Sequence, residues 1–195
     1  MKSEFSFDEV IICPDDPTAT SERIEQYKEY YKVKYELCKN QSPKVIAEIG
    51  VRAGYSAWTF LQACPGAKYV GFDANNGTHG GKGGENGKFF EWTKKILSKY
   101  DYELVELDTQ SVNELPISDV DFFHVDGDHT TKGVHHDLDI AFKSLSANGL
   151  IIVDDITYID TVRVGVNRWL TKMRGKASAE FVKSLRGEML IRRII

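Results

Sequence analysis

The chain contains little of what marks secreted, membrane-spanning or disulfide-stabilised proteins. Only three cysteines occur among 195 residues, Cys13, Cys38 and Cys64, and none forms a CxxC pair. This count argues against a disulfide framework and against a thiolate metal site. No apolar run approaches the roughly 20 residues that a membrane-spanning helix needs, and the N-terminus lacks the apolar core of a signal peptide. We therefore expect a cytoplasmic protein with reduced thiols.

An excess of positive charge is also missing. The chain has 25 lysines and arginines against 29 aspartates and glutamates, for a formal net charge of -4. Nucleic-acid binding through phosphate contacts depends on concentrated basic charge, so we do not expect a nucleic-acid partner. The length suits one domain with a full hydrophobic core, and we expect its partner to be a small molecule.

From residue 44 onward, apolar runs of strand length alternate with helical stretches. The runs are 44–49, 68–73, 102–107, 119–125 and 150–154. Such β-α alternation predicts an α/β fold with a parallel sheet covered by helices on both faces. One of the helices carries apolar residues from Val134 to Leu145, and we expect it to end at Asn148-Gly149 in a left-handed cap.

The two ends of the chain differ from this pattern. Apolar residues at helical spacing predict an amphipathic helix over 21–39. We therefore divide the chain into an N-terminal extension with its helix, 1–40, and a main domain, 41–195. After a last helix with Asp160 as its expected N-cap, two short runs, 179–184 and 188–195, predict a closing hairpin.

A glycine-containing turn follows the first predicted strand, in the segment Glu48-Ile49-Gly50-Val51-Arg52-Ala53-Gly54-Tyr55-Ser56. Glycine allows the backbone to turn sharply and to approach a ligand closely, and the helix that follows offers free N–H groups. The dinucleotide fingerprint G-x-G-x-x-G, started at Gly50, needs glycine at positions 52 and 55. Those positions hold Arg52 and Tyr55, which excludes a dinucleotide site of that type.

The turn instead resembles the E-x-G-x-x-x-G motif of class I S-adenosylmethionine-dependent methyltransferases. Asp73, which ends the second run, matches the acid that binds the ribose in that family, and Asp108 directly follows the third run, where the family contacts adenine. The resemblance covers about residues 44–195. It implies a Rossmann-like, doubly wound seven-stranded sheet in the order 3-2-1-4-5-7-6, mostly parallel with an antiparallel last strand. The implied contacts to S-adenosylmethionine are Glu48, Gly50, Gly54, Tyr55, Ser56, Asp73, Asp108, Thr109 and Asp126.

Three carboxylates follow the fourth and fifth runs. Asp126 lies in the segment Asp126-Gly127-Asp128-His129, and Asp154 and Asp155 come directly after residues 150–153. Ligands of open α/β sheets bind at the carboxyl ends of the strands. Carboxylates gathered there without a counter-charge are costly to ionise together, and a hard cation such as Mg²⁺, or Mn²⁺ or Ca²⁺, removes that cost.

The same segments resemble metal-dependent O-methyltransferases of the catechol and macrolide-sugar types. The resemblance implies that Asp126, Asp154 and Asp155 hold the metal and that His129 is the general base, which takes a proton from a hydroxyl of a sugar or phenol. Three alternatives stay open: Asp126 binds the cofactor without a metal, the enzyme is metal-independent with an unknown acceptor, or the chain is a binding protein without activity.

A glycine-rich segment, 75–87, follows the second run directly. Its position beside the expected ribose site suggests a lid with His79 and Lys82 as polar contacts, and a plain surface connection is the equal alternative. Little sequence is left for a substrate cap, so completion of the site by a second copy of the chain also stays open.

Overall fold

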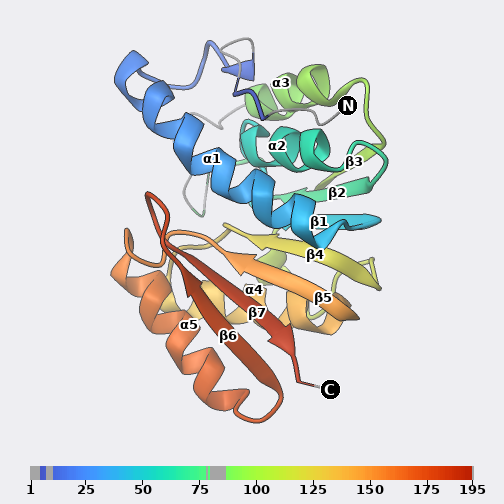
Figure 1. Cartoon of the computed structure of the whole chain (residues 1–195), viewed down its shortest axis with the longest axis vertical. Helices are drawn as coiled ribbons and strands as arrows, with labels where there is room; N and C mark the ends of the chain where they lie inside the picture. Colours follow the sequence, from blue (N-terminus) through green and yellow to red (C-terminus); the bar gives the residue numbers. More distant parts are fainter. Residues whose placement is uncertain (1–4, 8–10, 78, 80–86, 195) are drawn as a thin grey trace.

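A seven-stranded sheet organises the computed structural model, which describes residues 5–7, 11–77, 79 and 87–194. The strands are β1 (Val45–Ile49), β2 (Lys68–Asp73), β3 (Tyr102–Glu106), β4 (Val120–Val125), β5 (Leu145–Val153), β6 (Ala177–Val182) and β7 (Glu188–Arg193). Their order is β3-β2-β1-β4-β5-β7-β6, and only the pairings of β7 with β5 and β6 are antiparallel within the described residues (Figure 1). The predicted fold class and strand order are therefore confirmed.

Helices cover both faces of this sheet (Figure 1). They are α1 (Ser21–Gln41), α2 (Tyr55–Ala63), α3 (Lys88–Leu97), α4 (Thr131–Ser144) and α5 (Asp160–Lys172), with a short 3-10 helix, η3 (Thr109–Ser111). Two apolar cores result, one beneath α1, α2 and α3 and the other beneath α4 and α5. Burial on both faces explains why the central strands β1, β2, β4 and β5 contain nearly continuous apolar runs.

Alternation along each strand decides which face a side chain reaches. Ile46 and Phe122 pack in the core beneath α1 and α2, whereas Ala47 and Phe123 pack in the core beneath α4 and α5. Residues two apart in a strand share a face. Glu48 of β1 and His124 of β4, which are partners in register, therefore both face the α1 layer. The alternation thus places the polar side chains of these two residues beneath α1.

The cap predicted at Asn148-Gly149 is wrong. Helix α4 ends at Ser144 and β5 begins at Leu145, so Gly149 lies inside a strand, where the register with β4 shifts. A Cβ atom on Gly149 would lie 2.6 Å from the carbonyl oxygen of Val120. Glycine is therefore needed there for close approach of two backbones, and this need leaves the same sequence signal as a helix cap.

The N-cap predicted for α5 is also wrong by one residue. Ile159 occupies the cap position without a side-chain hydrogen bond, and Asp160 is the first helical residue. Its carboxylate pairs with Arg163 at 2.7 Å. A carboxylate in the first turn interacts favourably with the positive end of the helix dipole. Asp160 therefore does mark the start of α5, but as its first residue and not as its N-cap.

Helix α1 shares the hydrophobic core of the main domain. Tyr27, Tyr30 and Cys38 are buried in the same cluster as Trp58 of α2, and α1 runs across the sheet beside α2 (Figure 1). The division at residue 40 stays a prediction, but the helix clearly covers the sheet. None of the helices in the described residues is long and apolar enough to cross a membrane.

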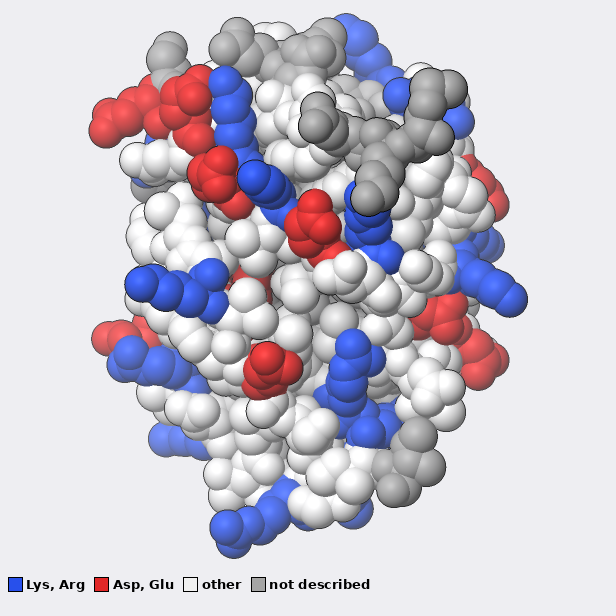
Figure 2. All heavy atoms as spheres, viewed as in Figure 1, with Lys and Arg blue, Asp and Glu red and all other residues white. Residues whose placement is uncertain are grey.

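On the face shown in Figure 2, charged side chains of both signs are interspersed. Among the described residues on that face, no large basic area stands out. The absence of a nucleic-acid partner stays a prediction.

Candidate active site

The glycine turn lies directly against the end of β4. Gly50 has φ +86° and Gly54 has φ +75°, both in the left-handed region. A Cβ atom on Gly50 would lie 1.9 Å from the carbonyl oxygen of Asp126. Two features therefore require glycine at position 50: its positive φ angle and the close approach of the Asp126 carbonyl group. The turn holds the start of α2 next to Asp126, the first of the predicted metal ligands.

A cavity of about 350 Å³ opens beside this turn, at the carboxyl edge of the sheet. Its size falls within the range of small-ligand sites. Six of the residues predicted to bind the cofactor line it: Gly50, Tyr55, Ser56, Asp73, Thr109 and Asp126. The sequence-predicted residues from β1, β2, β3 and β4 thus converge on one pocket.

Asp73 is held rigidly at the edge of that pocket. One carboxylate oxygen accepts a hydrogen bond from the backbone N–H of Arg52 at 2.9 Å, and the other accepts one from the N–H of Asn75 at 2.7 Å. A carboxylate has about four lone-pair sites, so acceptor capacity remains for a ligand. The side chain is therefore fixed in place with room for further hydrogen bonds.

Three predicted cofactor residues do not line the cavity. Gly54 is the N-cap residue of α2. Asp108 caps η3 by accepting from the N–H of Gln110 at 3.0 Å, and its Oδ1 lies 3.0 Å from Nε2 of His79. Glu48 is fully buried beneath the turn. Of the segment 75–87, His79 lines the cavity, while residues 78 and 80–86, Lys82 included, lie outside the described residues.

Glu48 belongs to a polar group under the sheet edge. Its carboxylate accepts hydrogen bonds from the hydroxyls of Ser56 and Tyr69 and contacts Nδ1 of His124 at 2.6 Å. All of these contacts of the Glu48 carboxylate are made with other side chains of the protein. Glu48 therefore braces the start of α2 and does not face the pocket.

Another part of the pocket wall is formed by three of the predicted residues, Asp126, His129 and Asp155. Nε2 of His129 lies 3.0 Å from Asp126 Oδ1 and 3.6 Å from Asp155 Oδ2. Each of the three offers a ligand atom, and those atoms lie within 4.8 Å of one another. Asp155 has φ +62°, a left-handed conformation that is uncommon outside glycine but tolerated by aspartate.

The two carboxylates control the protonation of His129. Burial alone would lower the pKa of His129, but the hydrogen bond and charge of Asp126, together with the charge of Asp155, raise it to about 9. Burial, followed by the charges of Asp126 and Asp154, raises the pKa of Asp155 to about 7. In the free protein at neutral pH, His129 therefore carries a proton and pairs with Asp126.

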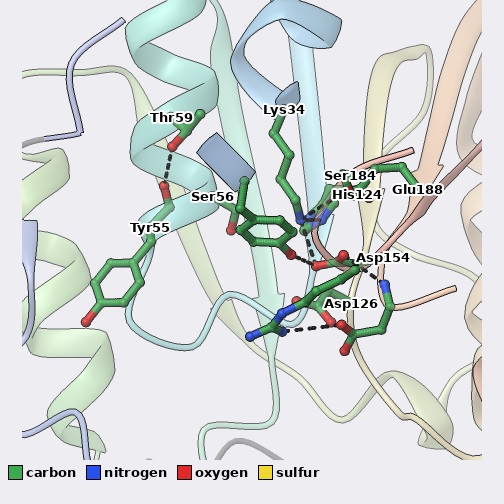
Figure 3. Close-up of polar contacts among 12 residues, drawn as sticks. Lys34, Tyr55, Ser56, Thr59, His124, Asp126, Asp154, Ser184 and Glu188 are labelled. Carbon is green, nitrogen blue, oxygen red and sulfur yellow. Dashed lines mark hydrogen bonds and ion pairs between the residues drawn. The ribbon is translucent and has the colours of Figure 1, made fainter. Parts of the chain in front are cut away.

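Asp154 is turned away from its neighbour Asp155 and does not line the pocket. It is fully buried, and its Oδ2 lies 2.7 Å from Nζ of Lys34 and accepts a hydrogen bond from the hydroxyl of Tyr30. Its Oδ1 accepts the N–H of Asp155 at 2.8 Å. Figure 3 shows Lys34 reaching from α1 to His124 and Asp154. The structure therefore brings Asp126 close to both aspartates, to Asp155 and His129 at the pocket and to the buried Asp154 and His124 beneath it.

Arg186, from the turn between β6 and β7, supplies positive charge at the pocket. Its Nη1 lies 3.3 Å from Asp155 Oδ1. The guanidinium also lies over the rings of Tyr30 and Tyr158, at 5.3 and 5.2 Å from their centroids. Arg186 therefore partly neutralises Asp155 and joins the closing hairpin to the site.

Comparison with known proteins agrees with this geometry. Residues 47–156, more than half of the chain, match the family model described as a methyltransferase domain. No curated protein sequence matches the chain.

Solved structures with the same fold include three methyltransferases. The O-methyltransferase TomG from Streptomyces achromogenes, involved in tomaymycin synthesis and in complex with SAM, has a TM-score of 0.64 at 18% identity, covering 85% of this chain and 79% of that one. An O-methyltransferase from Bacillus cereus in complex with SAH gives 0.64 at 18%, covering 84% and 80%. The SAH-bound methyltransferase PaMTH1 of Podospora anserina gives 0.63 at 17%, covering 90% and 80%.

These likenesses show the fold, and the family match adds the class of enzyme. The order of the strands, the glycine turn and the acid at the end of β2 all agree with the family resemblance found in the sequence. The chain belongs to the methyltransferase-domain family and is an S-adenosylmethionine-dependent methyltransferase of the class I fold.

Proposed function

We propose that this enzyme transfers the methyl group of S-adenosylmethionine to a hydroxyl oxygen of a small molecule, with His129 as the general base. One observation carries the proposal: Gly50 and Asp73 on one side, and Asp126, His129 and Asp155 on the other, line a single cavity. The TomG structure, an O-methyltransferase in complex with SAM, supports the same assignment by its fold.

The chemistry requires a proton acceptor beside the attacking oxygen. The acceptor hydroxyl would give its proton to the neutral imidazole of His129, the oxygen would form a bond to the methyl carbon, and the bond between that carbon and sulfur would break. The sulfonium becomes the neutral thioether of S-adenosylhomocysteine. Holding both reactants in one cavity supplies much of the rate enhancement, because it removes the entropy cost of bringing them together.

His129 must lose its proton before it can act as a base. Its pKa of about 9 in the free protein comes from the negative charges of Asp126 and Asp155, which outweigh burial. A sulfonium bound in this cavity would add a positive charge near the same side chains. A nearby positive charge disfavours the imidazolium, so cofactor binding would lower this pKa. Binding of the methyl donor thus prepares the base.

The carboxylates that face the pocket also fit a divalent ion. Mg²⁺ is commonly held by one or two carboxylates together with water and substrate oxygens. Asp126 and Asp155 would hold such an ion, and when bound it would lower the pKa of an acceptor hydroxyl. Asp154, the third residue that the sequence assigned to the metal, has both oxygens engaged by Lys34, Tyr30 and a backbone N–H.

The wall of the cavity formed by α1 and α2 favours a flat acceptor. Tyr27, Tyr30, Tyr31 and Tyr55 all line it, and their rings contact one another. Aromatic side chains bind planar rings and the apolar faces of sugars by stacking. We propose a phenol or a sugar as the acceptor, with the phenol favoured by this aromatic wall.

The proposal is tested directly by incubating the protein with methyl-labelled S-adenosylmethionine and a panel of phenols and sugars, followed by mass spectrometry. The expected result is a labelled methyl ether on one class of acceptor together with S-adenosylhomocysteine. Cofactor binding without transfer to any hydroxyl compound would argue against the O-methyltransferase assignment.

Replacing Asp73 by alanine should weaken cofactor binding. Loss of a charged hydrogen-bond acceptor to the ribose costs about 1.5–3 kcal/mol, so Kd should rise about 10- to 150-fold. Asp101→Ala, which removes an exposed aspartate just before β3, is the matched control and should leave Kd within about threefold of the parent value. Calorimetric titration with S-adenosylhomocysteine measures both. Equal affinities for the two variants would remove Asp73 from the cofactor site.

The protonation of His129 can be followed in the free protein by NMR of the imidazole. Its titration midpoint should lie at about 9. Asp126→Asn removes the hydrogen-bonded negative charge, so the midpoint should fall toward the ordinary histidine value of about 6.5. The resonance of His135, which contacts Asp139 instead, serves as an internal reference. A midpoint that does not move would mean that Asp126 does not control this base.

A further inference from the structure

A lysine is buried beneath the aspartates of the site, and the proposed chemistry does not use it. The side chain of Lys34 is 1% exposed. Its Nζ lies 2.7 Å from Asp154 Oδ2, 2.8 Å from Nε2 of His124 and 4.6 Å from the centroid of the Tyr30 ring. An unpaired ammonium in such a place would be very costly, so this one must have a fixed counter-charge.

Asp154 is the carboxylate that supplies this counter-charge. Glu188 lies farther away, with its nearer oxygen 4.0 Å from Nζ. The other candidate partner, His124, has its Nδ1 against Glu48, at 2.6 Å. The contact with Asp154 is therefore the short, charged one. Figure 3 shows Lys34, His124, Asp154 and Glu188 grouped together, beside Asp126.

We infer that Lys34 is the built-in counter-ion of Asp154, which withholds that carboxylate from the pocket and leaves Asp126 and Asp155 as the acids available to a bound cation. The ammonium contacts Asp154 and His124, two members of a group that also includes Asp126, and so supplies the positive charge that the sequence analysis assigned to a metal at Asp154. Lys34 belongs to α1, which lies outside residues 47–156 of the family match. A residue of the N-terminal helix therefore determines which carboxylates of the site are available to a cation.

The geometry also explains why adjacent aspartates differ. Asp154 continues the alternation of β5, in which Leu150 and Ile152 face the α1 layer, so its side chain points to that layer. Asp155 leaves the strand with φ +62° and lines the cavity. Lys34 thus fixes Asp154, whose Oδ1 in turn accepts the N–H of Asp155. We assign Lys34 as a positioning residue for the acids of the site.

The test is divalent-ion binding by the whole protein, measured by calorimetric titration with Mn²⁺ alone. Lys34→Met keeps most of the side-chain volume and frees Asp154. We expect Mn²⁺ to bind this variant at least about tenfold more tightly than the parent, since a third carboxylate becomes available. Lys32→Met, which removes an exposed lysine from the same helix, is the control for the change in net charge and should leave the affinity unchanged.

Stability supplies a second readout. Breaking a buried ion pair is strongly destabilising, so Lys34→Met should lower Tm by about 10 °C without the ion, and Mn²⁺ should restore part of that loss. The double variant with Asp154→Asn removes both charges. It should recover Tm and bind Mn²⁺ no more tightly than the parent protein does.

Two results would overturn the inference: Mn²⁺ binding to Lys34→Met that is no tighter than to the parent, or tight binding that persists in the double variant. If Lys34→Met does not fold, Asp154→Asn and Asp155→Asn decide the matter in the parent background. We expect only Asp155→Asn to weaken Mn²⁺ binding, and equal weakening by both would refute the proposal. The inference rests on the proposed function only for the location of the site, so a failure of methyl transfer would not alter these binding results.

Discussion

Replacing His129 by glutamine is expected to reduce kcat by about 10²- to 10⁴-fold, the usual contribution of a general base. Glutamine preserves a hydrogen-bond donor toward Asp126 but cannot take a proton from the acceptor. The measurement is steady-state turnover with the acceptor found in the panel described above. A loss of less than about threefold would show that the proton leaves by another route.

Two controls separate this catalytic loss from damage to the site. The Kd for S-adenosylhomocysteine should stay within about threefold of the parent value, because the proposed cofactor contacts come from the glycine turn and Asp73. His136→Gln is the matched variant. His136 lies in α4, its Nε2 contacts the carbonyl oxygens of Thr109 and Val112 at 3.0 and 2.9 Å, and it does not line the cavity. Its turnover should remain within about threefold of the parent.

The second large effect is expected from Gly50→Ala. The added Cβ atom would lie 1.9 Å from the carbonyl oxygen of Asp126, and alanine disfavours φ +86°. The turn must therefore move away from β4. We expect a loss of roughly 3 kcal/mol or more in the free energy of unfolding, measured by urea denaturation. We also expect binding of S-adenosylhomocysteine to be abolished, because the wall of the pocket is displaced.

Gly66→Ala is the matched control for this substitution. Gly66 precedes β2, and a Cβ atom built there meets nothing within 4 Å. The free energy of unfolding should change by less than about 1 kcal/mol, and cofactor affinity should not change. If Gly50→Ala behaved like Gly66→Ala, the close approach between the turn and Asp126 would not exist in solution.

Much of the fold follows from local sequence signals. Apolar runs interrupted by helical spacing predict the parallel strands, and the spacing of Gly50 and Gly54 identifies the ligand turn. The convergence of Asp73 and Asp126 on one cavity follows because parallel strands end at the same edge. The error at Gly149 has a clear cause. A glycine between a helix and a strand fits either a cap or a bulge, and only the position of Val120 distinguishes them.

The charge pairing of the site could not be predicted in the same way. Lys34 lies among the apolar positions of an amphipathic helix, and a lysine side chain in such a helix usually reaches solvent. Its counter-ion, Asp154, lies 120 residues away in the sequence. One signal was available in principle. Strand alternation puts Glu48, His124 and Asp154 on the same face as Ile46, so the helix covering that face must supply polar partners. Tyr30 and Lys34 are those partners.

The same alternation explains why Asp154 and Asp155 belong to two different groups of possible ligand atoms, Asp154 with Asp126 and His124, and Asp155 with Asp126 and His129. Asp154 and Asp155 are neighbours in sequence, and neighbours at the end of a strand tend to point to opposite sides. Asp155 lines the cavity, and Asp154 is buried beneath it. The role of each in metal binding stays a proposal, with Asp126 and Asp155 as the pair that faces the ligand.

The most direct test is an NMR experiment on the complex with S-adenosylmethionine carrying a ¹³C-labelled methyl group. If the methyl donor sits between the glycine turn and the acids, the methyl protons should give a nuclear Overhauser cross-peak to the His129 ring, and His129→Gln should abolish that peak. Cofactor that binds with its methyl group far from this ring, or a protein that does not bind the cofactor at all, would contradict the account.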